Sequence, residues 1–207
     1  IHAWSRHPVR AKNSKIVPAA VDITDEASIA KATNAVKSAH LVVVATGLLH
    51  SPDGLEPEKT WRDLDLGNLT RSFAINTIGP ALVAKHLMPQ MPRSERAIFA
   101  AISARVGSIG DNRLGGWYGY RASKAALNQM IKTLSIELAR SRPQSVCVGL
   151  HPGTVDTELS GPFKANVPER NLFSSERAAR QLLNVLGGLM PSDTGNLFAW
   201  DGTQVPF

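Results

Sequence analysis

Tyr120 and Lys124 stand four residues apart in the segment Tyr120-Arg121-Ala122-Ser123-Lys124. Positions i and i+4 of an α-helix share one face, about 6 Å apart along the axis. Because a fixed ammonium favours phenolate, this spacing predicts a tyrosine whose pKa lies below its ordinary value. Such a pair can act as a general acid or base near neutral pH. Taken alone, the pair is weak evidence, because an exposed helix face commonly shows the same spacing.

Other small and polar residues directly follow apolar runs that read as strands. In a parallel sheet, the carboxyl ends of neighbouring strands meet at one edge, where ligands bind. We therefore expect these residues to gather with Tyr120 and Lys124 at a single site. They are Thr46 and Gly47 after the run 41–45, Ser103 after 97–102, and Pro152, Gly153 and Thr154 after 145–150.

The elements that would position these residues alternate along the chain. Strands are predicted at 1–4, 16–21, 41–45, 97–102, 145–150 and 196–200, and helices at 26–39, 59–65, 67–89, 117–140 and from 174 or 175 to 186. Such alternation predicts an α/β fold, a Rossmann-like doubly wound parallel sheet in one domain, residues 1–207. Thr24 or Asp25 can cap the first helix. The Pro/Gly-rich segment 152–173 fits no element and is expected to be a substrate lid.

Composition narrows the class of protein. The 43% hydrophobic and 19% charged residues are those of a soluble globular domain, and no apolar run approaches the roughly 20 residues that cross a bilayer. Cys147 is the single cysteine and the first residues do not read as a secretory signal, so we expect a buried thiol and a cytoplasmic protein.

Charge and histidine spacing argue against two further classes. The net charge is +6, but the 23 Lys and Arg are scattered, which disfavours a nucleic-acid-binding surface. The six histidines show no metal-ligand spacing, so no metal site is predicted.

Seven segments in order along the chain resemble the short-chain dehydrogenase/reductase family, and within it the C-factor/Sniffer-type carbonyl-reductase-like group. The serine–tyrosine–lysine segment with the downstream Pro-Gly motif is the most specific part. The segments are Val21–Asp25, Ala45–Gly47, Asn76–Gly79, Ser103–Ile109, Gly115–Asn128, His151–Thr157 and Phe198–Gly202.

The resemblance implies hydride transfer between a nicotinamide cofactor and a carbonyl or alcohol. Tyr120 would exchange the proton of the substrate oxygen, and Lys124 would lower the pKa of Tyr120 and bind the nicotinamide ribose. Ser103 would hydrogen-bond the substrate oxygen, and Asn76 would hold a water on a proton relay to Lys124. The family often has a second serine where Ala104 stands here, so Ser108 is an alternative to Ser103. Asn76 could instead be a polar residue that bends its helix.

The resemblance also implies positions for the cofactor. Asp22 and Ile23 would lie near the adenine, although Asp22 could instead cap the next helix. Arg6 suits a 2′-phosphate and no acidic residue ends the first strand, so NADP is favoured over NAD. The nicotinamide end would be held by Ala45, Thr46, Gly47, Tyr120, Lys124, Pro152, Gly153, Val155 and Thr157.

The sequence also departs from the family pattern. The strand and Gly-rich turn with which the family begins are not found, so we expect an empty central position in the sheet and weak cofactor binding. An asparagine expected after the strand 41–45 is replaced in Ala45-Thr46-Gly47. The alternative function is therefore a C-factor-like signalling or binding protein on the same scaffold. In the family, the helices 67–89 and 117–140 form dimer interfaces, which implies a homodimer or homotetramer.

Overall fold

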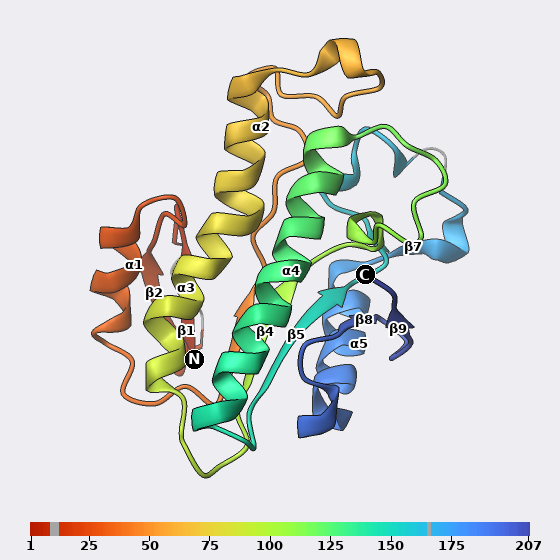
Figure 1. Ribbon diagram of the computed structural model, residues 1–207. Helices are drawn as coiled ribbons and strands as arrows, with labels where there is room; N and C mark the ends of the chain where they lie inside the picture. The colour runs from red at the N-terminus through yellow and green to blue at the C-terminus, as the bar shows by residue number, and fades with distance from the viewer. Residues whose placement is uncertain (9–12, 165–166) are drawn as a thin grey trace.

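Parallel strands form the centre of the molecule, and helices cover both faces (Figure 1). The computed structural model describes residues 1–8, 13–164 and 167–207. The larger sheet has the order β3-β4-β5-β8-β9, with β9 antiparallel at its edge. Its strands are β3 Leu41–Val44, β4 Ile98–Ile102, β5 Val146–His151, β8 Leu197–Ala199 and β9 Gln204–Val205.

A separate pair of parallel strands, β1 (His2–Ser5) and β2 (Val17–Ala20), lies on the β3 side of this sheet. Within the described ranges, β1 pairs only with β2, and β3 pairs only with β4. Leu41 and Val43 of β3 are accordingly 47% and 43% exposed. The parallel order is therefore broken between β1 and β3, as the sequence predicted for a central position of the sheet.

Two apolar layers hold the helices to the larger sheet. The long helix α4 (Tyr118–Ser141) and α3 (Gly79–Leu87) cover one face, and α1 (Glu26–Thr33) packs beside α3. Helix α5 (Ser175–Gly188) covers the opposite face through Leu182 and Leu186. Residues of β4 and β5 alternate between the two layers, which explains why these strands are apolar without a break. None of the described helices is long and apolar enough to cross a membrane.

The helix predicted over 67–89 has a π-helical turn in its middle. It consists of α2 (Leu66–Phe73), a π-helical turn at Ala74–Ile78, α3, and a 3-10 turn at Met88–Gln90. The chain therefore stays helical over residues 66–90, as predicted, and only the π-helical turn in the middle was not expected. Two features accompany this turn. The side chain of Asn76 is drawn to the main chain of Leu48, and Pro80 supplies no N–H to the helical ladder.

Most other predicted elements agree with the structure within a residue or two. Helix α1 is shorter than expected, ending at Thr33, and Asp25 is its N-cap, accepting from the Ala27 N–H. The segment 152–173 contains a short parallel pair, β6 (Thr154–Val155) and β7 (Leu172–Phe173). Strand β9 was not predicted. The single turn at Trp61–Asp63 replaces the helix expected over 59–65.

Cys147 is buried in β5, where its Sγ lies 3.7 Å from the carbonyl oxygen of Ile131 in α4. Burial raises the pKa of this thiol to about 12. The buried, unreactive thiol that the sequence predicted is therefore what the fold contains.

Candidate active site

Tyr120 and Lys124 share one face of the first two turns of α4, as their spacing predicted, and this face is buried. Tyr120 is 9% exposed and Lys124 is 2% exposed. The Lys124 Nζ lies 5.8 Å from the centre of the Tyr120 ring. It donates a hydrogen bond of 2.7 Å to the carbonyl oxygen of Ile102, at the carboxyl end of β4. The ammonium is thus fixed to the sheet edge while the phenol lies beside it.

The pKa values of the two groups differ from the prediction. Burial raises the pKa of Tyr120 to about 12 and lowers that of Lys124 to about 8. Removal of both groups from water outweighs their mutual attraction, because each charged form is disfavoured inside the protein. The expected lowering of the tyrosine pKa by Lys124 is therefore not what this structure shows. At neutral pH the phenol carries its proton and Lys124 remains mostly charged.

Asn76 ties the end of β3 to α4. Its Oδ1 accepts from the Leu48 N–H at 2.8 Å, and its Nδ2 donates to the Leu48 carbonyl at 2.8 Å and to the Ser123 Oγ at 3.0 Å. Ser123 in turn donates to the Tyr120 carbonyl. Both amide hydrogens of Asn76 are used, so its role toward a relay water stays a prediction, and its helix has a π-helical turn at this position.

Ser103 is 1% exposed, and its hydroxyl bonds to Asn128 Oδ1 at 2.6 Å. No hydrogen bond joins it to Tyr120 or Lys124 in the described part of the chain. Ser108, the alternative, accepts from the Asp111 N–H and is equally buried. The contact of Ser103 with a substrate oxygen stays a prediction, and it would require this hydroxyl to leave Asn128.

Two strand ends approach the Tyr120–Lys124 pair. A Cβ added to Gly47 would lie 3.7 Å from Lys124 Nζ and 3.8 Å from Asn76 Oδ1, so the end of β3 closely faces both. Ala45 and Thr46 are exposed beside it. Ile102 of β4 contributes the carbonyl that holds Lys124.

The segment after β5 folds back over the same edge. Gly153 has φ +75°, and a Cβ there would meet Phe173 at 2.7 Å and Trp200 at 3.0 Å, so only glycine fits beside Pro152. Val155 pairs with Phe173, and the exposed Thr157 begins a 3-10 turn. This turn lies near β3, because the Glu158 carbonyl is 2.7 Å from His50 Nε2.

The predicted adenine-side residues form a second, more open group. Arg6 is exposed after β1 and Asp22 is half-buried after β2. Hydrogen bonds from Thr24, with a smaller contribution from the Arg6 charge, hold the pKa of Asp22 below its ordinary value. Asp25 rather than Asp22 caps α1. Ile23 packs against Gly79, where a Cβ would approach it to 2.5 Å.

The short chain dehydrogenase family matches residues 3–168 of the chain. The chain belongs to this family. It is also 37% identical to the "C-signal" protein of Myxococcus xanthus over 146 residues, which cover 70% of this chain and 82% of the relative.

Two solved structures support the fold of this family member. One, an NADPH-bound carbonyl reductase from chicken fatty liver, is 25% identical, with 93% of this chain and 77% of the other covered at a TM-score of 0.78. The other, the carbonyl reductase Sniffer of D. melanogaster, is 23% identical, with 94% and 79% covered at a TM-score of 0.80. The split parallel sheet is therefore a dehydrogenase fold, and the protein is an oxidoreductase by family.

The residues present fit the two ends of a nicotinamide dinucleotide. Near Lys124, the phenol, the ammonium and the exposed main chain of residues 45–47 offer donors and acceptors to a ribose and an amide. Arg6, after β1, offers a guanidinium to a phosphate. Among the described residues, no Gly-rich turn leads into a helix at the gap in the sheet between β1 and β3. A turn of that kind would hold a pyrophosphate.

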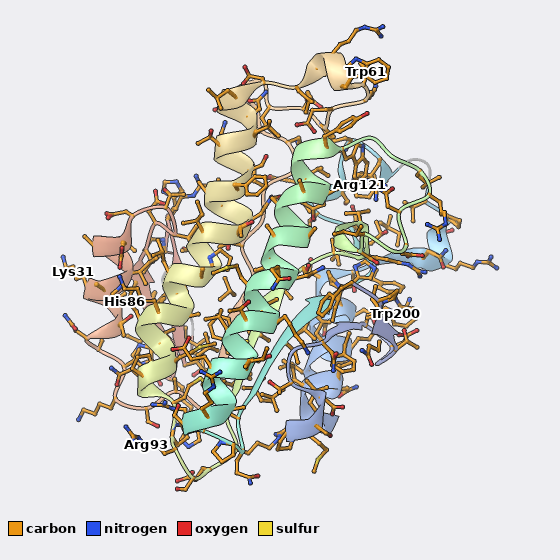
Figure 2. All side chains as sticks on the ribbon, viewed as in Figure 1. Lys31, Trp61, His86, Arg93, Arg121 and Trp200 are labelled. Carbon is orange, nitrogen blue, oxygen red and sulfur yellow. The ribbon has the colours of Figure 1, made fainter. Side chains whose placement is uncertain are left out.

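Sequence reasoning missed several residues that build the site. Ser123 and Asn128 are the buried partners of Asn76 and Ser103, and both stand in the segment Gly115–Asn128 that carries the family motif. Arg121 lies near the N-terminal end of α4 in Figure 2, where its Nε donates to the carbonyls of Gly115 and Gly116. The i, i+4 rule did not draw attention to Arg121, because its partners are main-chain atoms.

Proposed function

We propose that the protein is an NADP-dependent reductase that transfers a hydride between the nicotinamide and a small carbonyl or alcohol. One observation carries this proposal. A buried phenol and a buried ammonium share one face of α4, and the carbonyl of Ile102 fixes the ammonium at the carboxyl edge of the sheet. Family membership supports the same reaction class.

In the direction of reduction, the Tyr120 hydroxyl would donate its proton to the substrate oxygen. The raised pKa of Tyr120 suits this role, because the phenol stays protonated until a substrate needs the proton. Lys124 would stabilise the phenolate that remains and would bind the ribose of the cofactor. A bound nicotinamide would supply the hydride. Ser103 would hydrogen-bond the substrate oxygen after release from Asn128, and Asn76 would hold a water on a proton relay to Lys124.

Four further parts of the proposal depend on other positions in the chain. Arg6 would bind the 2′-phosphate of NADP, in line with the NADPH-bound relative of known structure. Residues 152–173, which approach the end of β3 through Glu158, would act as a lid. The outer faces of α2, α3 and α4 would form a homodimer or homotetramer interface, and the reduced thiol of Cys147 suits the cytoplasm.

Replacement of Tyr120 by Phe tests the reaction, with Tyr118→Phe as a matched control. Tyr118 is 37% exposed and its i+4 neighbour is Ala122. Over a panel of carbonyl compounds, we expect Tyr120→Phe to slow NADPH oxidation by about 10³-fold and Tyr118→Phe to leave it nearly unchanged. Equal turnover in both variants would exclude Tyr120 as the acid. Cofactor binding by the unsubstituted chain with no turnover on any carbonyl would favour the signalling alternative.

A further inference from the structure

Glu58 is a buried carboxylate beside the start of α4. It is 6% exposed, and no salt bridge to it is present among the described residues. Its Oε2 accepts from the Gly119 N–H at 3.1 Å, and its main-chain carbonyl accepts from the Trp117 N–H at 2.5 Å. Burial of a carboxylate without an ion pair is unfavourable by several kcal/mol unless hydrogen bonds and fixed dipoles compensate.

The compensation comes from the N-terminus of α4. This helix begins after Trp117, whose indole offers no oxygen to cap the first N–H groups, and the helix has no side-chain cap of its own. Glu58 supplies that acceptor from 61 residues earlier in the chain. Its negative charge also faces the positive end of the helix dipole. Glu58 therefore caps the N-terminus of α4 from a distant loop.

The same contact holds a strained main chain in place. Trp117 is the one described non-glycine residue with positive φ, at +52°, a conformation that is unfavourable by about 1–2 kcal/mol. In this conformation the indole lies edge-on to the Tyr120 ring, with 6.4 Å between ring centres, and packs on Phe163 at 5.1 Å. The fit is close, since a Cβ on Gly119 would lie 2.7 Å from Glu58 Oε1.

Tyr120 and Lys124 depend on this cap to different degrees. Tyr120 is in the first turn of α4, where helices fray, whereas Lys124 is one turn further and is fixed by the carbonyl of Ile102. Loss of the cap would move the phenol while the ammonium stayed in place. The geometry points to Glu58 as a positioning residue that sets Tyr120 against Lys124; this inference rests on the function proposed above.

The loop that ends at Glu58 is anchored at other points of the site as well. Near its start, Leu48 is held through both its N–H and its carbonyl by Asn76, and His50 contacts the carbonyl of Glu158. The loop thus connects the end of β3, the segment after β5 and the start of α4. Because the buried core lies on other elements, a shift at Glu58 would displace the Tyr120 phenol more than the core.

The kinetic test compares Glu58→Ala, Glu58→Gln and, as a matched control, Glu56→Ala at an exposed position of the same loop. We expect Glu58→Ala to lower kcat by about 10–100-fold with KM for NADPH nearly unchanged, since displacement of a reacting group affects chemistry more than cofactor binding. Glu58→Gln should restore most of kcat, because its amide oxygen still accepts from Gly119. A kcat for Glu58→Ala within about twofold of that for Glu56→Ala, or no recovery in Glu58→Gln, would overturn the proposal.

A second measurement requires no turnover. The chain has two tyrosines, so Tyr118→Phe leaves Tyr120 as the single tyrosine. NMR of ring-labelled tyrosine in this background should show a signal shifted by the Trp117 ring, lost in Glu58→Ala and retained in Glu58→Gln. An unmoved signal in Glu58→Ala would overturn the positioning role. A signal that moves as expected, in a chain that turns over no carbonyl, would instead support the cap and reject the proposed reaction.

Discussion

The two ends of the proposed cofactor site are built differently. Around Tyr120 and Lys124, the polar side chains of Asn76, Ser103 and Ser123 are at most 1% exposed, and each has a hydrogen-bond partner inside the protein. Around Arg6 and Asp22, the side chains lie at the surface of a two-stranded sheet. In the proposed reaction, the groups around Tyr120 would thus be preorganised by burial, whereas affinity for the adenosine end would come from surface charge.

The largest effect is expected from Lys124→Met, which tests whether the buried end of the proposed site depends on its ammonium. Methionine is unbranched like lysine but one heavy atom shorter and uncharged, so we expect turnover to fall by about 10³-fold. The free energy of unfolding should hold or rise, because a buried ammonium without a carboxylate partner is removed. NADPH oxidation and thermal unfolding, measured side by side, check both expectations. Turnover within tenfold of the unsubstituted chain would show that the buried ammonium is not needed.

His151, at the end of β5, tests the electrostatic side of the preorganised end. Its Nδ1 is buried without a partner among the described residues, and burial lowers the pKa of the ring from 6.5 to about 4. Between these values the unfolded chain binds a proton that the folded chain does not. The free energy of unfolding should therefore fall by about 3 kcal/mol as the pH drops from 6.5 to 4.

His151→Gln should flatten this dependence, whereas His7→Gln, at an exposed position, should leave it intact. Urea unfolding across the acid range measures both slopes. If the free energy of unfolding depends on pH as steeply in His151→Gln as in the unsubstituted chain, groups other than His151 cause the dependence.

Gly107→Ala sharpens the comparison through packing alone. A Cβ at Gly107 would lie 2.8 Å from main-chain and side-chain carbons of Lys124, so the turn at Arg105–Gly107 would be pushed away from α4. We expect a loss of about 2 kcal/mol in the free energy of unfolding. Gly187→Ala is the control: it meets nothing within 4 Å in α5 and should gain up to about 1 kcal/mol. Chemical unfolding of both variants measures whether each substitution raises or lowers the free energy of unfolding. An unchanged value in Gly107→Ala would show that the turn at Arg105–Gly107 can move aside.

The smallest effect is expected at the open end. Arg6→Ala should raise KM for NADPH by about tenfold and leave KM for NADH and kcat nearly unchanged, because one surface charge–phosphate contact is lost. Arg93→Ala, exposed at the other end of the molecule in Figure 2, is the control. Equal changes in KM for NADPH and for NADH would show that Arg6 does not bind the 2′-phosphate.

The sequence predicted the elements whose signals are local and regular. Helix α4 and strands β4 and β5 were placed within a residue or two, because α4 carries a long periodic pattern and both strands are continuous apolar runs. The shared face of Tyr120 and Lys124 followed from helix geometry alone. Their carboxyl-edge location followed from the alternation of strands and helices.

Features that depend on contacts between distant residues could not be predicted in this way. The π-turn at Asn76 forms because Leu48, far away in sequence, occupies its amide. The raised pKa of Tyr120 reflects burial, which a spacing rule does not contain. Glu58 caps a helix from another part of the chain, and the left-handed Trp117 leaves no local signature in a residue type that rarely adopts it.

The single thiol of Cys147 can serve as a built-in probe of motion between α4 and β5. Its sulfur lies between β5 and α4, so an alkylating reagent can reach it only when the helix that carries Tyr120 separates from the sheet. The rate of labelling would then measure how often α4 separates from β5, without any added probe. Ligands that bind both α4 and the sheet would lower the labelling rate. Reagents of increasing size would show how wide each opening is.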